Sequence, residues 1–184
     1  MPIRAVSLLP FAATALSAAL ALSPLGMPTR PTRSSVFFSI LNICNMFWAG
    51  AHFVELNADT WRYAESGPLW LALIAIRPAL TVIAASGSVT YLLLLVLELG
   101  GWTEWARGRR LFALHLPALF IIALQLLEPV LSSDTLMGID AQGHAGPLGI
   151  LTRLTLYAMA ISAIVMLLRA VLTKRLRVSW VTTL

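Results

Sequence analysis

Five long apolar stretches divide this chain and most constrain how it can fold. They lie at residues 5–25, 36–56, 68–102, 111–131 and 148–168. An α-helix needs about 20 residues to cross the 30 Å hydrocarbon core of a bilayer. Hydrophobic residues make up 59% of the 184 residues and charged residues only 11%, whereas soluble domains carry about 25% charged residues. The sequence therefore predicts one all-α domain over residues 1–184, an integral membrane bundle of about five transmembrane helices.

The third stretch is too long for a single untilted crossing. Its 35 residues would span about 50 Å as one helix. Pro78 lacks a backbone N–H and disfavours helix at Arg77. We therefore expect a bend near Pro78, with one crossing from about Ala79 to Glu98 and a short helical segment before it at the outer interface.

The basic residues predict the orientation of these helices. Of the 13 arginines and lysines, nine follow the first, third and fifth stretches: Arg30, Arg33, Arg107, Arg109, Arg110, Arg169, Lys174, Arg175 and Arg177. Cytoplasmic loops are rich in arginine and lysine, so the N-terminus is expected outside and the C-terminus inside, in a bacterial inner membrane. The net charge of +5 then reflects topology, and the expected partners are lipid and other integral membrane proteins, with no nucleic acid.

The first stretch has an alternative interpretation. Residues 1–26 resemble a signal peptide, with Arg4 before the apolar run and Ala19-Leu20-Ala21 near its end. The basic residues after the run outweigh Arg4, however, and favour a retained first helix with its N-terminus outside.

Ionisable side chains predict one candidate site in the outer third of the bundle. Its members are His52, Glu55, Arg77, Glu128 and Arg153. Charged groups inside a membrane are costly, so a paired inward-facing cluster is a functional candidate that could bind a ligand. The alternatives are a structural cluster, or arginines that extend to the headgroups, which we favour for Arg77. His52 and Glu55 share a helix face and could share a metal ion, but solvation or pairing is favoured and no metal site is predicted.

The remaining residues do not predict catalysis or a bound cofactor. His115 is expected near the inner face, a bilayer away from His52, which argues against bis-histidine haem. Ligation of a pigment by a single histidine stays open. Ser86 or Ser88 with His115 would be too far apart for an intramembrane protease. The lone Cys44 is expected to be a small buried side chain. The chain is therefore not expected to be an enzyme.

Several motifs resemble a known family. They are Asn45-Met46-Phe47-Trp48 through Glu55, Leu97-Glu98-Leu99-Gly100-Gly101, Arg107-Gly108-Arg109-Arg110, the segment Leu111 to Pro117, and Arg153 through Tyr157 to Arg169. Over residues 36–177 this order is similar to the N-terminal seven-transmembrane sensor region of bacterial histidine kinases. The resemblance implies a membrane sensor with inner basic turns. The sequence has about five such segments and no kinase domain, so kinase activity is not implied.

Two functions follow from these patterns. The first is a non-catalytic integral membrane subunit of a larger membrane protein complex, because the helices offer much apolar surface to other membrane proteins. The second is a membrane sensor that binds a ligand in its outer half and signals through a separate partner. The short loops, none longer than about fifteen residues, offer little to a soluble partner and favour the first function.

Overall fold

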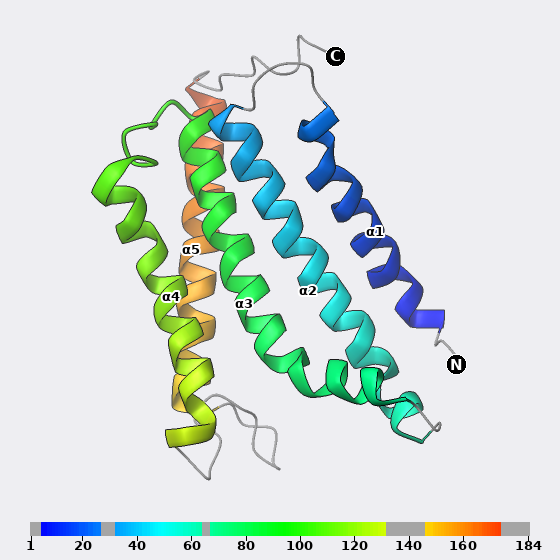
Figure 1. Ribbon diagram of the computed structural model, residues 1–184. Helices are drawn as coiled ribbons and strands as arrows, with labels where there is room; N and C mark the ends of the chain where they lie inside the picture. Colours follow the sequence, from blue (N-terminus) through cyan, green and yellow to red (C-terminus); the bar gives the residue numbers. More distant parts are fainter. Residues whose placement is uncertain (1–4, 27–31, 64–66, 132–145, 174–184) are drawn as a thin grey trace.

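The computed structural model describes residues 5–26, 32–63, 67–131 and 146–173, and this part of the chain is helical, without strands (Figure 1). Short 3-10 helices, η1 (Ala5–Ser7) and η2 (Ser23–Gly26), flank α1 (Leu8–Leu22). The other helices are α2 (Arg33–Tyr63), α3 (Pro68–Leu99), α4 (Gly108–Leu131) and α5 (Pro147–Leu172). The predicted all-helical class is confirmed.

Within the residues that the structure describes, four helical segments are long and apolar enough to cross a membrane. They are Ala5–Leu22, Arg33–Ala58, Ile76–Leu99 and Gly149–Leu172. The sequence predicted about five such helices, and α4, with its 24 residues, is the one outside this set of four. The span within α3 agrees with the predicted single crossing that starts near Pro78.

Local sequence signals explain where the helices begin and end. Both α3 and α5 start with a proline after an extended glycine, Gly67 and Gly146, which suits the unpaired N–H groups of a first turn. Gly101, with φ of +83°, and Gly108, with φ of +55°, lie at the two ends of the α3–α4 connection. Glycine adopts this left-handed backbone without a Cβ penalty.

The helix α3 continues through Pro78, although the sequence disfavours helix at Arg77. Proline removes the N–H that would bond to the carbonyl of Ile74, and such a gap commonly bends a helix. The backbone does turn here, and the first part of α3 runs across one end of the molecule (Figure 1). One turn further along, the Thr81 hydroxyl donates to the Arg77 carbonyl at 2.9 Å.

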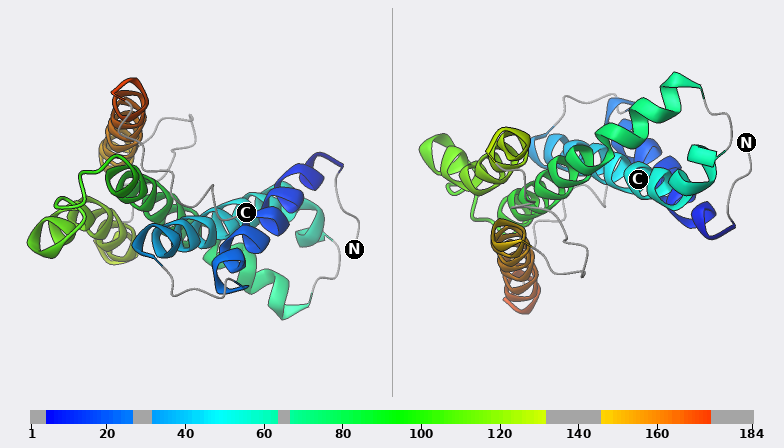
Figure 2. Two further views of the ribbon diagram at one scale, coloured as in Figure 1. Left: turned by 90° about the horizontal axis from the view of Figure 1, so that it is seen from above. Right: turned by 90° about the horizontal axis from the view of Figure 1, so that it is seen from below.

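The helices form an open assembly centred on α3. α3 packs against α2, α4 and α5, whereas α1 packs against α2 alone among the other α-helices, and α4 barely touches α5. Seen along the helices, α1, α2 and α3 form a row from which α4 and α5 diverge (Figure 2). In the apolar part of α3, 44% of the residues are buried, whereas in the apolar part of α5 only 11% are buried.

The buried side chains follow α3. One cluster joins Leu94 to Phe37 of α2 and Ala106, and another joins Leu93 and Leu97 to Ala163 of α5. Small residues allow helices to approach closely. A Cβ on Gly87 of α3 would lie 2.6 Å from the Cys44 sulfur of α2, so α2 and α3 approach closely at this pair.

Candidate functional site

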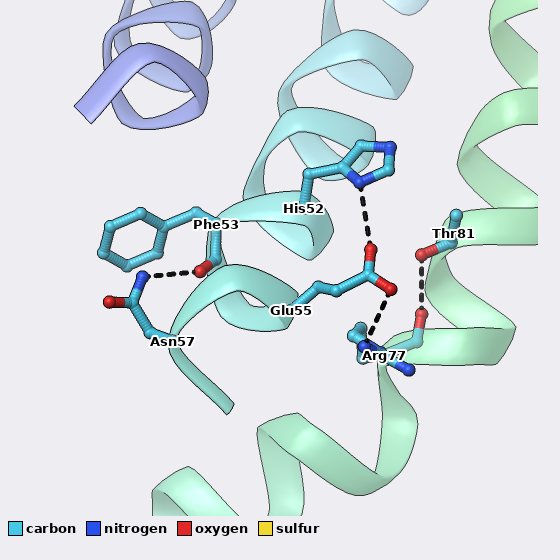
Figure 3. A network of polar contacts seen from close by, with 6 residues as sticks. All are labelled: His52, Phe53, Glu55, Asn57, Arg77 and Thr81. Carbon is cyan, nitrogen blue, oxygen red and sulfur yellow. Dashed lines mark hydrogen bonds and ion pairs between the residues drawn. The ribbon is translucent and has the colours of Figure 1, made fainter. Parts of the chain in front are cut away.

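The structure brings three of the five predicted site residues together, at the end of the molecule where α3 bends. The Glu55 carboxylate lies 3.1 Å from Nδ1 of His52 through Oε2 and 3.1 Å from Nη1 of Arg77 through Oε1 (Figure 3). An ionised carboxylate only accepts hydrogen bonds, so both His52 and Arg77 donate to it. This cluster, His52–Glu55–Arg77, links α2 to α3.

The local fold explains this geometry. Residues three apart on a helix are neighbours on one face, which places His52 beside Glu55. Arg77 immediately precedes Pro78, where α3 turns across the end of α2 (Figure 3). The bend thus presents the guanidinium to the Glu55 carboxylate. Arg77 is paired to an acid of α2, whereas the sequence interpretation favoured its extending alone to the outer headgroups.

The cluster is partly open to its surroundings. The side chains of His52 and Glu55 are 46% and 48% exposed, while that of Arg77 is 28% exposed. The carboxylate and guanidinium charges balance, so a neutral His52 leaves the cluster with no net charge. Because Nδ1 of His52 faces Glu55, its Nε2 is the atom that can bond to a ligand.

A groove between α1 and α2 reaches the same histidine. It has a volume of about 620 Å³ and its lining includes Ser17, Asn45, Trp48, His52 and Leu56. The rings of Trp48 and His52 lie 5.8 Å apart. The groove therefore combines an apolar wall with an imidazole, an amide and a hydroxyl, a composition common to sites that bind small molecules.

Sequence reasoning did not identify Ser17 and Asn45 as part of this site. The signal in the sequence is the helical spacing of Asn45, Trp48, His52 and Leu56, which places them on one side of α2. That stripe does not by itself reveal which face of α1 covers it, because α1 is apolar on nearly every side.

Of the other two predicted site residues, only Arg153 has a described side chain, and it does not contact this cluster. Arg153 is exposed on α5, which packs on α3 and α4 and not on α2. Glu128 belongs to α4, but its side chain lies outside the described residues.

The histidines considered as cofactor ligands occupy separate helices. His115 of α4 lies with Nδ1 2.8 Å from the Leu111 carbonyl and its ring 5.5 Å from Tyr91. α4 does not pack on α2, which carries His52. His144 lies outside the described residues. Among the residues that the structure describes, no three His, Cys, Asp or Glu side chains gather as a metal site would require.

The chain was compared with known protein families, curated proteins and solved structures. No protein-family model, curated protein or solved structure matches the chain.

Proposed function

We propose that the protein is a non-catalytic integral membrane subunit of a larger membrane protein complex. The observation that carries this proposal is the open arrangement of the helices. α4 and α5 each pack on α3 but barely contact each other, and large apolar side chains cover the outward face of α5, among them Leu154, Ile161 and Val165, each more than half exposed. Membrane helices associate mainly through packing, and within the described part of the chain each of these two helices packs mainly on α3.

The proposal includes five crossings of a bacterial inner membrane, with the N-terminus outside and the C-terminus in the cytoplasm. In this arrangement α4 also crosses the membrane, which brings the number of crossings to five. Arg33, Arg107, Arg109, Arg110 and Arg169 belong to helix ends at one end of the molecule (Figure 1), which supports an inner location for that end. The motif resemblance to the sensor region of histidine kinases supports the same orientation.

Photo-crosslinking and purification together test the subunit function. A photoreactive residue at Ile161, which is 59% exposed, or at Val165, which is 56% exposed, should crosslink to one companion protein. The same residue at Ala163, which is 1% exposed and faces α3, is the control and should crosslink within the chain. The companion should also co-purify stoichiometrically in mild detergent. Purification of the chain alone, with only lipid adducts at Ile161 and Val165, would reject the proposal.

A second candidate function is a membrane sensor, and the groove at His52 specifically favours it. A ligand in the groove could bond to Nε2 of His52, and Glu55 would connect that histidine to Arg77 of α3. Ligand binding would then act on the α2–α3 contact at the bend.

Small-molecule mass spectrometry of the purified protein tests the sensor function. A bound molecule other than bulk phospholipid should be retained by the wild-type protein and lost from Trp48→Ala and His52→Ala. Arg153→Gln, remote from the groove, should retain it. If wild type retains only bulk phospholipid, the sensor function fails.

A further inference from the structure

The connection between α3 and α4 is a fixed turn that carries the arginines of the motif Arg107-Gly108-Arg109-Arg110. Its backbone is bonded internally, from Trp102 N–H to the Leu97 carbonyl at 2.9 Å and from Trp105 N–H to the Trp102 carbonyl at 2.9 Å. Ala106 is fully buried against Phe37 and Leu94. The turn is thus anchored in the core while its arginines point outward.

The positive charge of this turn is poorly compensated. Arg107, Arg109 and Arg110 are all exposed, and the first turn of α4 contains no acidic residue. The N-terminus of a helix carries partial positive charge, so arginines there are unfavourable unless an anion is present. Glu104 lies 3.7 Å from Arg110. Within the described part of the chain, neither Arg107 nor Arg109 has an acidic side chain within ion-pair distance.

Two tryptophans accompany these arginines. The Arg110 guanidinium lies 4.8 Å from the centre of the Trp105 ring, and that of Arg169 of α5 lies 6.0 Å from the Trp102 ring. Trp102 rests on Gly100, where a Cβ would clash with the indole, and it packs against the cluster that contains Ala163. The aromatic rings therefore hold two guanidinium groups at the same end of the molecule.

Apolar side chains continue directly from this charged turn along α4. Phe112 is 62% exposed and Leu116 is 48% exposed. A ligand that complements both the arginines of the turn and the apolar side chains of α4 has an anionic head at the arginines and hydrocarbon along Phe112 and Leu116. A nucleic acid or an acidic peptide would leave the apolar part uncovered.

We infer that the turn formed by Trp102–Arg110 binds the phosphate headgroup of an anionic phospholipid, whose acyl chains lie along α4. Arginine suits this role because its planar donors match phosphate oxygens, and tryptophan is enriched at membrane interfaces. The inference rests on the membrane placement in the proposed function but does not require a protein companion.

The test measures lipid binding to the full chain alone. Native mass spectrometry of the protein in mixed micelles gives its affinity for phosphatidylglycerol relative to phosphatidylcholine. We expect wild type to prefer phosphatidylglycerol, and Arg107→Gln and Arg109→Gln each to weaken its binding about five-fold, since one basic residue near an anionic surface contributes about 1 kcal/mol. The matched control is Arg153→Gln, which removes one exposed arginine at the opposite end of the molecule and should leave the preference unchanged.

Three outcomes would overturn the inference. The first is equal affinity of wild type for the two lipids. The second is an unchanged preference in variants that unfold at the wild-type temperature in phosphatidylcholine. The third is full displacement of phosphatidylglycerol by millimolar inorganic phosphate, which would indicate a site for free phosphate. Because no companion is present, a lipid preference measured here stands even if the subunit proposal fails, and its absence leaves that proposal intact.

Discussion

Gly87 and Cys44 limit how closely α2 and α3 approach each other. The space for a Cβ at Gly87 is filled by the Cys44 sulfur, whereas the nearest side-chain atoms to a Cβ at Gly50, which faces α1, lie 4.0 Å away in Thr14. Both positions are glycines inside helices, where alanine is intrinsically favoured. The two sites therefore differ mainly in the available space.

We expect Gly87→Ala to be about 1 kcal/mol less stable than Gly50→Ala, because overfilled packing costs free energy. Denaturation of each variant in mixed detergent micelles measures the difference. Adding Cys44→Ala to Gly87→Ala should recover most of the loss. Equal stability of the two single variants would show that the sulfur moves aside without cost.

The ion pair between Glu55 and Arg77 is the polar contact that joins α2 to the bend of α3. Both side chains are partly exposed, and ion pairs of this kind contribute about 0.2–1 kcal/mol. A double-mutant cycle of Glu55→Gln and Arg77→Gln should give a coupling energy of about 0.5 kcal/mol. The control cycle of Glu55→Gln with Arg153→Gln should be additive. Coupling in both cycles would point to a general charge effect instead of a direct contact.

At the scale of the element, α3 determines the arrangement of the other helices. It contacts α2, α4 and α5, and its bend carries Trp70 and Ile74 under the end of α2, where they pack with Ala58. The part before Pro78 and the part after it thus contact α2 in different directions.

We expect Pro78→Ala to straighten α3, because alanine restores the hydrogen bond to the Ile74 carbonyl. Spin labels at Leu69 and Leu99, in a Cys44→Ala background, report its end-to-end length. A straight helix rises about 45 Å between Leu69 and Leu99, and the label distance should increase toward that value. Pro117→Ala in α4 is the control. An unchanged distance in Pro78→Ala would assign the bend to tertiary packing.

The sequence predicted the positions of the helices well, but it did not predict which face of each helix turns inward. Apolar length located each helix to within a few residues, except that α2 extends to Tyr63 instead of ending near residue 56. Hydropathy falls beyond Leu56, yet the backbone bonds of a helix continue through polar residues. Asn57 lies in this extension, and its side-chain amide donates to the Phe53 carbonyl one turn earlier at 2.8 Å.

The candidate site was predictable only where it depends on spacing within one helix. The interval between His52 and Glu55 predicts their contact, but their link to Arg77 depends on how α3 bends. Arg153 was grouped with them only because its predicted depth in the membrane is similar. A helix that is apolar on most faces does not reveal which face turns inward, and α5 places Arg153 on its exposed side.

At the scale of the whole molecule, the two ends differ in charge, and one of them is rich in arginine. Exposed Glu104 and its neighbouring arginines lie in the α3–α4 connection, whereas exposed Gly67 precedes α3 at the opposite end (Figure 1). A membrane-impermeant maleimide distinguishes the two ends when each position is a single cysteine in a Cys44→Ala background.

We expect Gly67→Cys to be labelled from outside the inner membrane and Glu104→Cys only after the membrane is permeabilised, because the arginine-rich end is proposed to be cytoplasmic. Total labelling after detergent solubilisation controls for reactivity. The reverse pattern would invert the proposed topology.

The packing order also bears on biogenesis. α1 packs on α2, α2 on α3 and α3 on α4, and α5 returns to α3. In the proposed membrane placement, each helix after α1 therefore leaves the translocon beside a partner that was synthesised earlier. Contacts between segments near in sequence form quickly. The chain can thus assemble stepwise during translation, with α5 joining last beside a helix whose other neighbours are already in place.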